Sequence, residues 1–228
     1  YIVNTCSVTA VSDQKSRQVI HGVQRKHPGA VVAVCGCYPQ THADDVRKLG
    51  VDLISGTGDR TGFIRLLEEA AAEKRQIEAI DQPFERRVFE VLPAGGLGGR
   101  TRAMLKVEDG CVNFCTYCII PKLRGHYRSR KMEELIAEAK TLAEDGVKEL
   151  IVVAQDTSRY GEDLYGARKL PELLRELCKI DGFHWIRVHY LYPEAISEEL
   201  IDVFATEPKL VKYFDIPFQH INDEILKK

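Results

Sequence analysis

Three cysteines, Cys111, Cys115 and Cys118, follow one another with the spacing C-x3-C-x2-C. Thiolates are soft ligands that suit iron–sulfur clusters or zinc, and Gly110 directly before them gives the loop the freedom to wrap around one metal centre. A structural zinc site normally takes four ligands, whereas a cubane cluster held by three cysteines leaves one iron open to a small molecule. The spacing therefore favours an open-site iron–sulfur cluster, with zinc or a redox pair as the alternatives.

The segments on either side of the cysteines predict a strand, a loop and a helix. Residues 103–107 are a short, mostly apolar run that predicts a strand. Residues 122–130 form a basic run, and residues 132–145 have the single apolar stripe of a helix. The basic run could hold a phosphate or a carboxylate, but a solvated face suits most of its members better.

Residues 1–80 alternate between apolar runs and helical periodicity. Strands are expected at 1–4, 30–34 and 51–55, and helices at 12–26, 41–49 and 61–74. This alternation predicts an α/β domain with a doubly wound parallel sheet. Cys6 and Cys37 follow consecutive strands, so the two thiols could meet; the alternative is that both are inert core residues. Cys35 is expected to be a core thiol.

Residues 81–99 are predicted to be a linker, because Pro83, Pro93 and the glycine-rich tract 95–99 break any long helix. From residue 100 to 228 the βα pattern returns. Further strands are expected at 147–154, 185–190 and 213–216, and helices at 170–180 and 197–206. Polar loops at the strand ends predict a TIM-like α/β barrel with its active site on that face. Because only about four units are present, we expect a partial barrel.

Several polar side chains of the predicted barrel are candidates for a site. Gln155 and Asp156 follow the second strand, and Gln219 follows the fourth. Arg187 and His189 alternate with an apolar residue on the third strand, so both side chains could point inward, or could form a hydrogen-bonded core pair. Cys178, on a leucine-rich helix, is expected to be a core residue.

Composition limits the class of protein. The chain has 228 residues, of which 44% are hydrophobic, enough for a substantial core. The net charge of −2 means that any contact with nucleic acid must be local. No apolar run is long enough for a membrane span, and seven clustered cysteines suit metal sites in a reducing cytoplasm. Because Tyr1 opens within a strand, we expect the sequence to be a piece of a longer protein.

The cysteine motif, with Tyr117 just before its third cysteine, resembles that of the radical S-adenosylmethionine (SAM) superfamily. The longer pattern resembles the methylthiotransferases within that superfamily; it comprises residues 110–111, 118–121, 124–125 and 128–130. The resemblance implies that the three cysteines of the loop hold a [4Fe–4S] cluster whose open iron binds SAM. An electron donor would reduce the cluster, and a 5′-deoxyadenosyl radical would abstract hydrogen from an unactivated C–H, where a methylthio group is installed.

The resemblance also implies roles for other residues. Tyr117 would lie near the adenine of SAM, with a packing aromatic as the alternative. Gln155 and Asp156 would contact the methionine end of SAM, and Gln219 is in another SAM-contacting region; a solvated loop is the alternative for each.

A second [4Fe–4S] cluster is implied in the N-terminal domain. Residues 4–6 and 36–40 resemble two of the three cysteine motifs that hold this cluster in methylthiotransferases, which makes Cys6 and Cys37 its ligands. The third motif is absent from this sequence, so one ligand of that cluster is missing.

Two branches of the methylthiotransferases match different parts of the chain. Residues 4–9, 13–18 and 99–103 resemble the MtaB branch, which modifies threonylcarbamoyl-adenosine beside the tRNA anticodon. Residues 119–122, 154–161, 189–194 and 215–217 resemble the RimO branch, which modifies an aspartate of a small-subunit ribosomal protein. The barrel mouth faces the substrate, so the ribosomal protein is slightly favoured as the partner.

Two other classes of function remain open. A zinc-stabilised RNA-binding module without catalysis would use the basic run 122–130, but the sequence has no paired C-x2-C motif to support it. A radical SAM enzyme of another reaction type is the other class, and the matching N-terminal domain weakens it.

Overall fold

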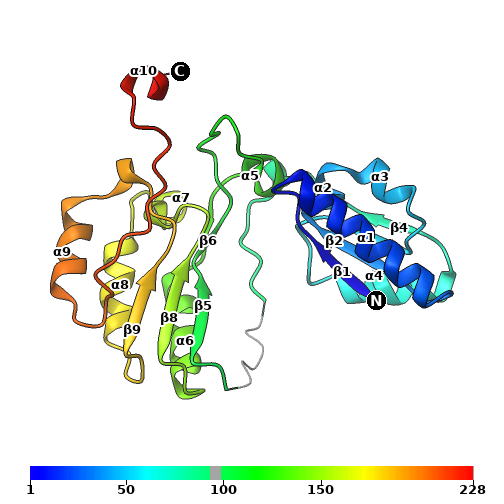
Figure 1. The fold of residues 1–228 in the computed structure, drawn as a ribbon. Helices are drawn as coiled ribbons and strands as arrows, with labels where there is room; N and C mark the ends of the chain where they lie inside the picture. Colours follow the sequence, from blue (N-terminus) through cyan, green and yellow to red (C-terminus); the bar gives the residue numbers. More distant parts are fainter. Residues whose placement is uncertain (93–98, 228) are drawn as a thin grey trace. The chain divides into compact units, whose positions relative to one another are not determined.

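The computed structural model describes residues 1–92 and 99–227 (Figure 1). By its internal contacts the chain divides into two compact units, Tyr1–Leu92 with Val112–His126, and Pro93–Cys111 with Tyr127–Lys228. Part of the predicted linker, residues 93–98, lies outside the described residues. The domain boundaries predicted at residues 80 and 99 stay predictions; the contact-based division differs from them by grouping 112–126 with the first unit.

The first unit contains a parallel sheet whose four strands follow one another in chain order (Figure 1). The strands are β1 (Ile2–Thr5), β2 (Ala33–Gly36), β3 (Leu53–Ser55) and β4 (Ile77–Ala79). The helices are α1 (Ala10–Lys26), α2 (Cys37–Thr41), α3 (Ala43–Arg47), α4 (Phe63–Glu73), the 3-10 helix η1 (Pro83–Glu85) and, in the cysteine loop, α5 (Ile120–Arg124). The expected parallel α/β sheet is confirmed, and β4 is an additional strand.

Both faces of this sheet are buried. On one face Val34 and Ile54 pack with Ile20 of α1. On the other face Leu53 packs with Ala70 of α4. Successive residues of a strand point to opposite faces, so the continuous apolar runs seen in the sequence are what a parallel sheet covered on both sides requires.

The second unit is built on a three-stranded parallel sheet in the order β5-β8-β9 (Figure 1). Its strands are β5 (Arg102–Lys106), β8 (Glu149–Val153) and β9 (Trp185–Val188), and a short antiparallel pair is formed by β6 (Glu108–Asp109) and β7 (Arg128–Ser129). Its helices are α6 (Met132–Glu144), η2 (Thr157–Arg159), α7 (Glu162–Tyr165), α8 (Leu170–Cys178), η3 (Pro193–Ala195), α9 (Glu198–Thr206) and α10 (Asp223–Leu226).

Helices α6, α8 and α9 pack on one face of the β5-β8-β9 sheet. Leu105 and Leu150 belong to a single buried cluster with residues of these helices, such as Leu135. On the opposite face, the side chains of Met104 and Trp185 are 71% and 56% exposed. Sequential parallel strands with helices on one face form an arc of an α/β barrel, which confirms the predicted fold class.

The strand predicted at 213–216 is wrong. Leu210 forms an isolated parallel bridge with Ile186 of β9, but the N–H of Tyr213 then donates to the carbonyl of Val211 at 2.7 Å. This local turn takes the backbone out of the ladder. Further along, the two segments meet again through Asp215, whose carbonyl oxygen accepts the N–H of Leu191 and whose carboxylate accepts the N–H of Tyr190.

Across the described ranges, 1–92 and 99–227, no helix has both the length and the apolar character that a membrane crossing demands.

Gly36 tests the close approach of β1 and β2. Its φ is +99°, and a Cβ there would lie 2.5 Å from the carbonyl oxygen of Thr5. Gly29 is a matched control, because its φ is also positive, at +85°, but nothing lies within 4 Å. We predict that Gly36→Ala lowers the free energy of unfolding by about 1–3 kcal/mol through backbone strain, and lowers it further through the clash with Thr5. Gly29→Ala should lower it by about 1–2 kcal/mol, through strain alone. Equal shifts in urea denaturation would contradict this.

Candidate metal centre

The two ends of the cysteine loop are joined at its base by β6 and β7. Glu108 pairs with Ser129 and Asp109 with Arg128 in this antiparallel ladder. The side chains repeat the pairing, because Arg128 donates to the Asp109 carboxylate at 2.7 Å, with 4% and 12% of the two side chains exposed. Lys106 also contacts Asp109, at 2.6 Å. We call this arrangement the loop base.

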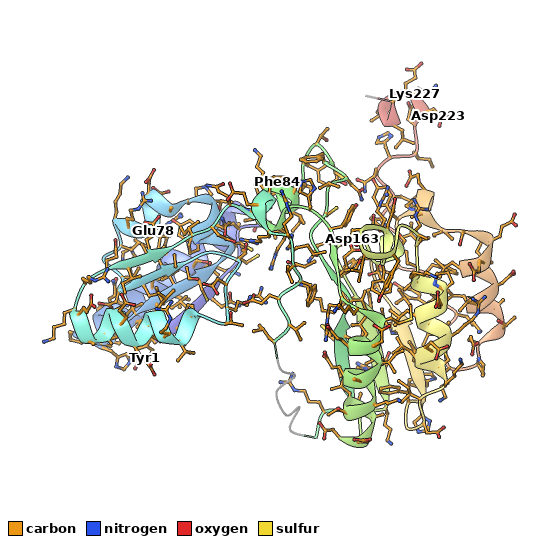
Figure 2. The ribbon with its side chains drawn as sticks, turned by 180° about the vertical axis from the view of Figure 1, so that it is seen from behind. Tyr1, Glu78, Phe84, Asp163, Asp223 and Lys227 are labelled. Atoms are coloured by element: carbon orange, nitrogen blue, oxygen red, sulfur yellow. The ribbon has the colours of Figure 1, made fainter. Side chains whose placement is uncertain are left out.

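Ser129 connects the loop base to α7. Asp163 of α7, labelled in Figure 2, accepts the backbone N–H of Ser129 at 3.0 Å and its hydroxyl at 2.6 Å. The Ser129 oxygen in turn accepts the N–H of Gly161 at 2.9 Å. Arg130, next along the chain, pairs with Glu138 of α6 at 2.7 Å. The loop base is therefore attached to the barrel helices.

Burial of Arg128 and Arg130 corrects one expectation. The basic run was expected to be mostly a solvated face, but these two arginines are only 4% and 5% exposed. Their partners Asp109 and Glu138 explain the difference, because a buried guanidinium is tolerated when a carboxylate compensates it. Lys122 in the same run is exposed, as expected.

Cys111 emerges directly from the loop base and is 9% exposed. The residue before it, Gly110, has φ +100°, a value that favours glycine. Its backbone N–H donates to Oε1 of Gln155 at 2.8 Å. Gln155 thus positions the backbone next to Cys111, a contact that the sequence did not suggest; its predicted contact with SAM stays a prediction.

Cys115 and Cys118 lie in a tight turn of the same loop. The N–H of Cys118 donates to the carbonyl of Cys115 at 2.9 Å. Both thiols line a hollow of about 370 Å³, whose other walls include Phe114 and Tyr117. Phe114, with φ +49°, stacks on Phe84 at a ring-centroid distance of 6.1 Å.

These residues fit an iron–sulfur cluster by their donor chemistry, since soft thiolates and an adjacent hollow are what such a group needs. Within the part of the chain that the structure describes, no three or more Cys, His, Asp and Glu side chains are arranged to hold a metal ion. Cys111, Cys115 and Cys118 share one loop, and their use as a ligand set is taken up below as a proposal.

Asp156 is buried and its carboxylate has polar partners within the protein. It is 1% exposed, its carboxylate accepts the hydroxyl of Ser158 at 2.5 Å, and Arg159 lies 3.4 Å away. Tyr117, by contrast, is 75% exposed. The predicted contacts of Asp156 and Tyr117 with SAM stay predictions.

Gln219 carries a buried polar atom. Among the described residues its Oε1 has no hydrogen-bond partner, although buried polar atoms are normally satisfied. An unsatisfied amide oxygen is compatible with the predicted role of Gln219 in binding a ligand.

Cys6 and Cys37 lie at the carboxyl ends of two hydrogen-bonded strands. Each follows directly after the last pair of the β1–β2 ladder, Thr5 with Gly36. The hydroxyl of Thr5 donates to the carbonyl of Cys35 at 2.7 Å and accepts the N–H of Tyr38 at 3.1 Å. This register brings the two thiols to the same edge of the sheet, as the sequence suggested.

The two remaining cysteines differ in burial, because Cys178 lies in the core of the second unit whereas Cys35 is only partly buried. Cys35 lies beside Asn4, with its sulfur 3.8 Å from the amide oxygen, and burial raises its pKa. Burial likewise raises the pKa of Cys178 to about 12. Neither thiol is activated as a nucleophile.

Arg187 and His189 each pair with a carboxylate and not with each other. Arg187 donates to Glu149 at 2.8 Å, and Arg102 donates to the same carboxylate at 2.5 Å. The ring of His189 lies 3.0 Å from Asp215. Both belong to the sheet face that carries exposed Met104, as an inward orientation in a barrel requires.

A second hollow of about 1330 Å³ is lined by residues that include Arg102, Lys148 and Trp185. These residues stand at the amino-terminal ends of β5, β8 and β9. Active sites of α/β barrels lie at the opposite, carboxyl-terminal ends, where the cysteine loop begins. The larger hollow is therefore not the catalytic candidate.

The architecture and the loop together define a class: a parallel α/β barrel arc with three cysteines behind its first strand. A family model described as the radical SAM superfamily matches residues 105–228. The chain belongs to the radical SAM superfamily. A second model, described as the uncharacterized protein family UPF0004, matches residues 1–56.

The chain is similar over its whole length to methylthiotransferases. The ribosomal protein uS12 methylthiotransferase RimO of Clostridioides difficile is 47% identical over 232 residues, which cover 99% of this chain and 52% of that protein. The RimO of Pelobacter propionicus is 45% identical and covers 99% and 51%. The chain thus spans about half the length of the curated relatives it matches.

Solved structures support the fold. The radical SAM methyltransferase TsrM from Kitasatospora setae, solved with cobalamin and a [4Fe–4S] cluster bound, has a TM-score of 0.66 and 18% identity, covering 99% of this chain and 50% of that one. The cobalamin-dependent SAM radical enzyme OxsB has a TM-score of 0.60 and 11% identity, covering 99% and 36%.

Glu108 generates a prediction about pH. It is fully buried. Its Oε2 lies 3.3 Å from the Ser129 hydroxyl, which donates over a shorter distance to Asp163, and its Oε1 has no partner among the described residues. Burial first, then the charges of Asp156 and Asp163, with a smaller effect of Asp109, raise its pKa well above the usual range. Folding therefore favours the protonated acid. As the pH rises above about 4.3, where an unfolded glutamate ionises, the native state loses stability progressively up to the folded pKa.

Glu108→Gln should remove this loss of stability at higher pH, because the glutamine amide is neutral at every pH and has a shape similar to that of the carboxyl group. We predict that the variant gains stability relative to the wild type between pH 5 and pH 8, measured by urea denaturation at each pH. Glu138→Gln is the control, because its carboxylate is paired with Arg130 and its removal should destabilise. A pH-independent difference for the Glu108 variant would contradict the prediction.

Proposed function

We propose that this chain is the cluster-binding part of a radical SAM methylthiotransferase that modifies ribosomal protein uS12. The observation that carries the enzyme class is the three-cysteine loop, which starts at a rigid base behind the first strand of a parallel barrel arc. The substrate follows from the relatives, which are named for uS12 across both halves of the chain. Residues 4–9 and 13–18 resemble the tRNA-modifying MtaB branch, but we keep uS12 as the proposed substrate.

Cys111, Cys115 and Cys118 would hold a [4Fe–4S] cluster. With SAM bound and one electron supplied by a donor protein, such a cluster provides the radical chemistry that attacks an unactivated C–H. The chain's own contribution is geometric. The loop base holds Cys111 through Gly110 and Gln155, while the turn at Cys115 presents two thiols to one hollow.

The carboxyl ends of the barrel strands would supply the SAM contacts. Tyr117 at the hollow, Gln155, Asp156 and Gln219 are the proposed binding residues. Asp156, together with Gln155, would contact the methionine end of SAM, and its carboxylate also accepts the hydroxyl of Ser158. Gln219 would use its unsatisfied Oε1 as an acceptor.

A second cluster would bind at the N-terminal sheet edge, where Cys6 and Cys37 follow the paired ends of β1 and β2. Two thiols are too few for a cubane with one open iron, so a third ligand is needed from outside these motifs. The second cluster would take part in supplying the sulfur of the methylthio group.

The proposal is tested in the complete protein that carries this chain, reconstituted anaerobically with iron and sulfide. With SAM, reductant and uS12, we expect uS12 to gain one methylthio group and 5′-deoxyadenosine to be released, both seen by mass spectrometry. Cys115→Ala should abolish both and lower the iron content. Cys178→Ala is the matched control and should keep both, because that thiol lies in the core.

Two outcomes would overturn parts of the proposal. Methylthiolation of tRNA, with uS12 unchanged, would contradict the substrate. Stoichiometric zinc with no cleavage of SAM would contradict the enzyme class and favour an RNA-binding module, whose affinity for RNA would fall steeply with salt.

A further inference from the structure

The phenol of Tyr127 lies next to the sulfur of Cys111. The Tyr127 oxygen is 3.9 Å from Sγ of Cys111, within the range of a hydrogen bond to sulfur. Both residues belong to the same compact unit. No motif in the sequence singled out Tyr127, which there appears only as a member of the basic run.

The loop base explains why these two residues meet. Asp109 and Arg128 form the last pair of the antiparallel ladder, and Cys111 and Tyr127 lie just beyond this pair on the two segments. The ladder therefore brings the two segments together next to the contact. Cys111 is buried and Tyr127 is half-buried, which partly shields the contact from water.

A cation lies over the aromatic ring of Tyr127. The guanidinium of Arg159 lies over the Tyr127 ring, 5.8 Å from its centroid, a distance at which a cation is attracted to the ring face. Arg159 is itself held by Asp156 at 3.4 Å and by Glu162 at 3.1 Å. The orientation of the phenol is thus determined by three further side chains.

The protonation states of Tyr127 and Cys111 determine which of the two donates the hydrogen bond. In the thiol form either group can donate, but a metal-bound thiolate has no proton and can only accept. A phenol is protonated at neutral pH. With a metal on Cys111, Tyr127 must be the donor.

We propose that Tyr127 is a positioning residue that donates a hydrogen bond to the Cys111 sulfur and thereby raises the reduction potential of the cluster. This inference rests on the proposed function, because it requires a cluster on Cys111. A hydrogen bond withdraws electron density from the ligand sulfur and stabilises the more negative, reduced cluster; hydrogen bonds to the sulfurs are among the factors that set iron–sulfur potentials. Its role would be to make the electron needed for SAM cleavage easier to accept.

A purely structural role predicts something different. If Tyr127 only fills space between Arg159 and Cys111, removing its hydroxyl would change stability or iron loading, and the potential would stay the same. The potential of the loaded cluster therefore separates the two roles.

The test compares Tyr127→Phe with the unaltered sequence, both in the complete protein that carries this chain and after anaerobic reconstitution. Phenylalanine keeps the ring under Arg159 and removes only the donor. We expect the equilibrium constant for one-electron reduction of the cluster to fall about tenfold, which is a shift of about 59 mV to more negative potential. The potential is measured by a redox titration monitored by EPR. Tyr160→Phe is the control, because that buried hydroxyl donates to the carbonyl of Arg130 at 2.9 Å and not to a thiol.

A second variant keeps the test decisive if Tyr127→Phe does not load. Tyr127→3-fluorotyrosine retains the ring and the hydroxyl and makes the hydroxyl a stronger donor, so the potential should move up. A potential equal to the wild type's in either loaded variant would overturn the inference. Failure of the unaltered chain to bind iron at all would instead count against the proposed function, which the iron content of the wild type reports separately.

Discussion

Closure of the cysteine loop at its base is the constraint on which the candidate site depends. Only two residue pairs, Glu108 with Ser129 and Asp109 with Arg128, form this ladder. The ion pair between Asp109 and Arg128 reinforces the second of them. Both side chains are buried, and Lys106 also contacts the Asp109 carboxylate, so the charges at the loop base compensate one another. The position of Cys111 follows from this closure.

Much of the fold was predictable because its signals are local. Buried parallel strands appear in the sequence as apolar runs. The helix over 198–206 begins after Ser197, whose side chain caps it. The cysteine spacing likewise identified the candidate ligands. Other features depended on contacts distant in sequence. Strands of two residues have no periodicity to detect, and the burial of Arg130 depends on Glu138. The strand expected at 213–216 failed because a local hydrogen bond at Tyr213 replaced the ladder.

The two cysteine groups follow one structural rule. Cys6 and Cys37 come directly after the paired ends of β1 and β2, and Cys111 follows the strands that begin the barrel arc. Carboxyl ends of parallel strands are where α/β folds place their ligands. In both groups the cysteines come shortly after strand ends, with Cys37 as the first residue of α2 and Cys111 directly after Gly110 in the cysteine loop.

The most direct test of the central claim, an open-site cluster on the cysteine loop, is EPR of the reduced, iron-reconstituted chain before and after addition of SAM. We expect about four irons per loop cluster and a cluster signal that changes when SAM binds, because one iron lacks a protein ligand. A signal that SAM leaves unchanged would mean that all irons are already ligated, and would contradict the account.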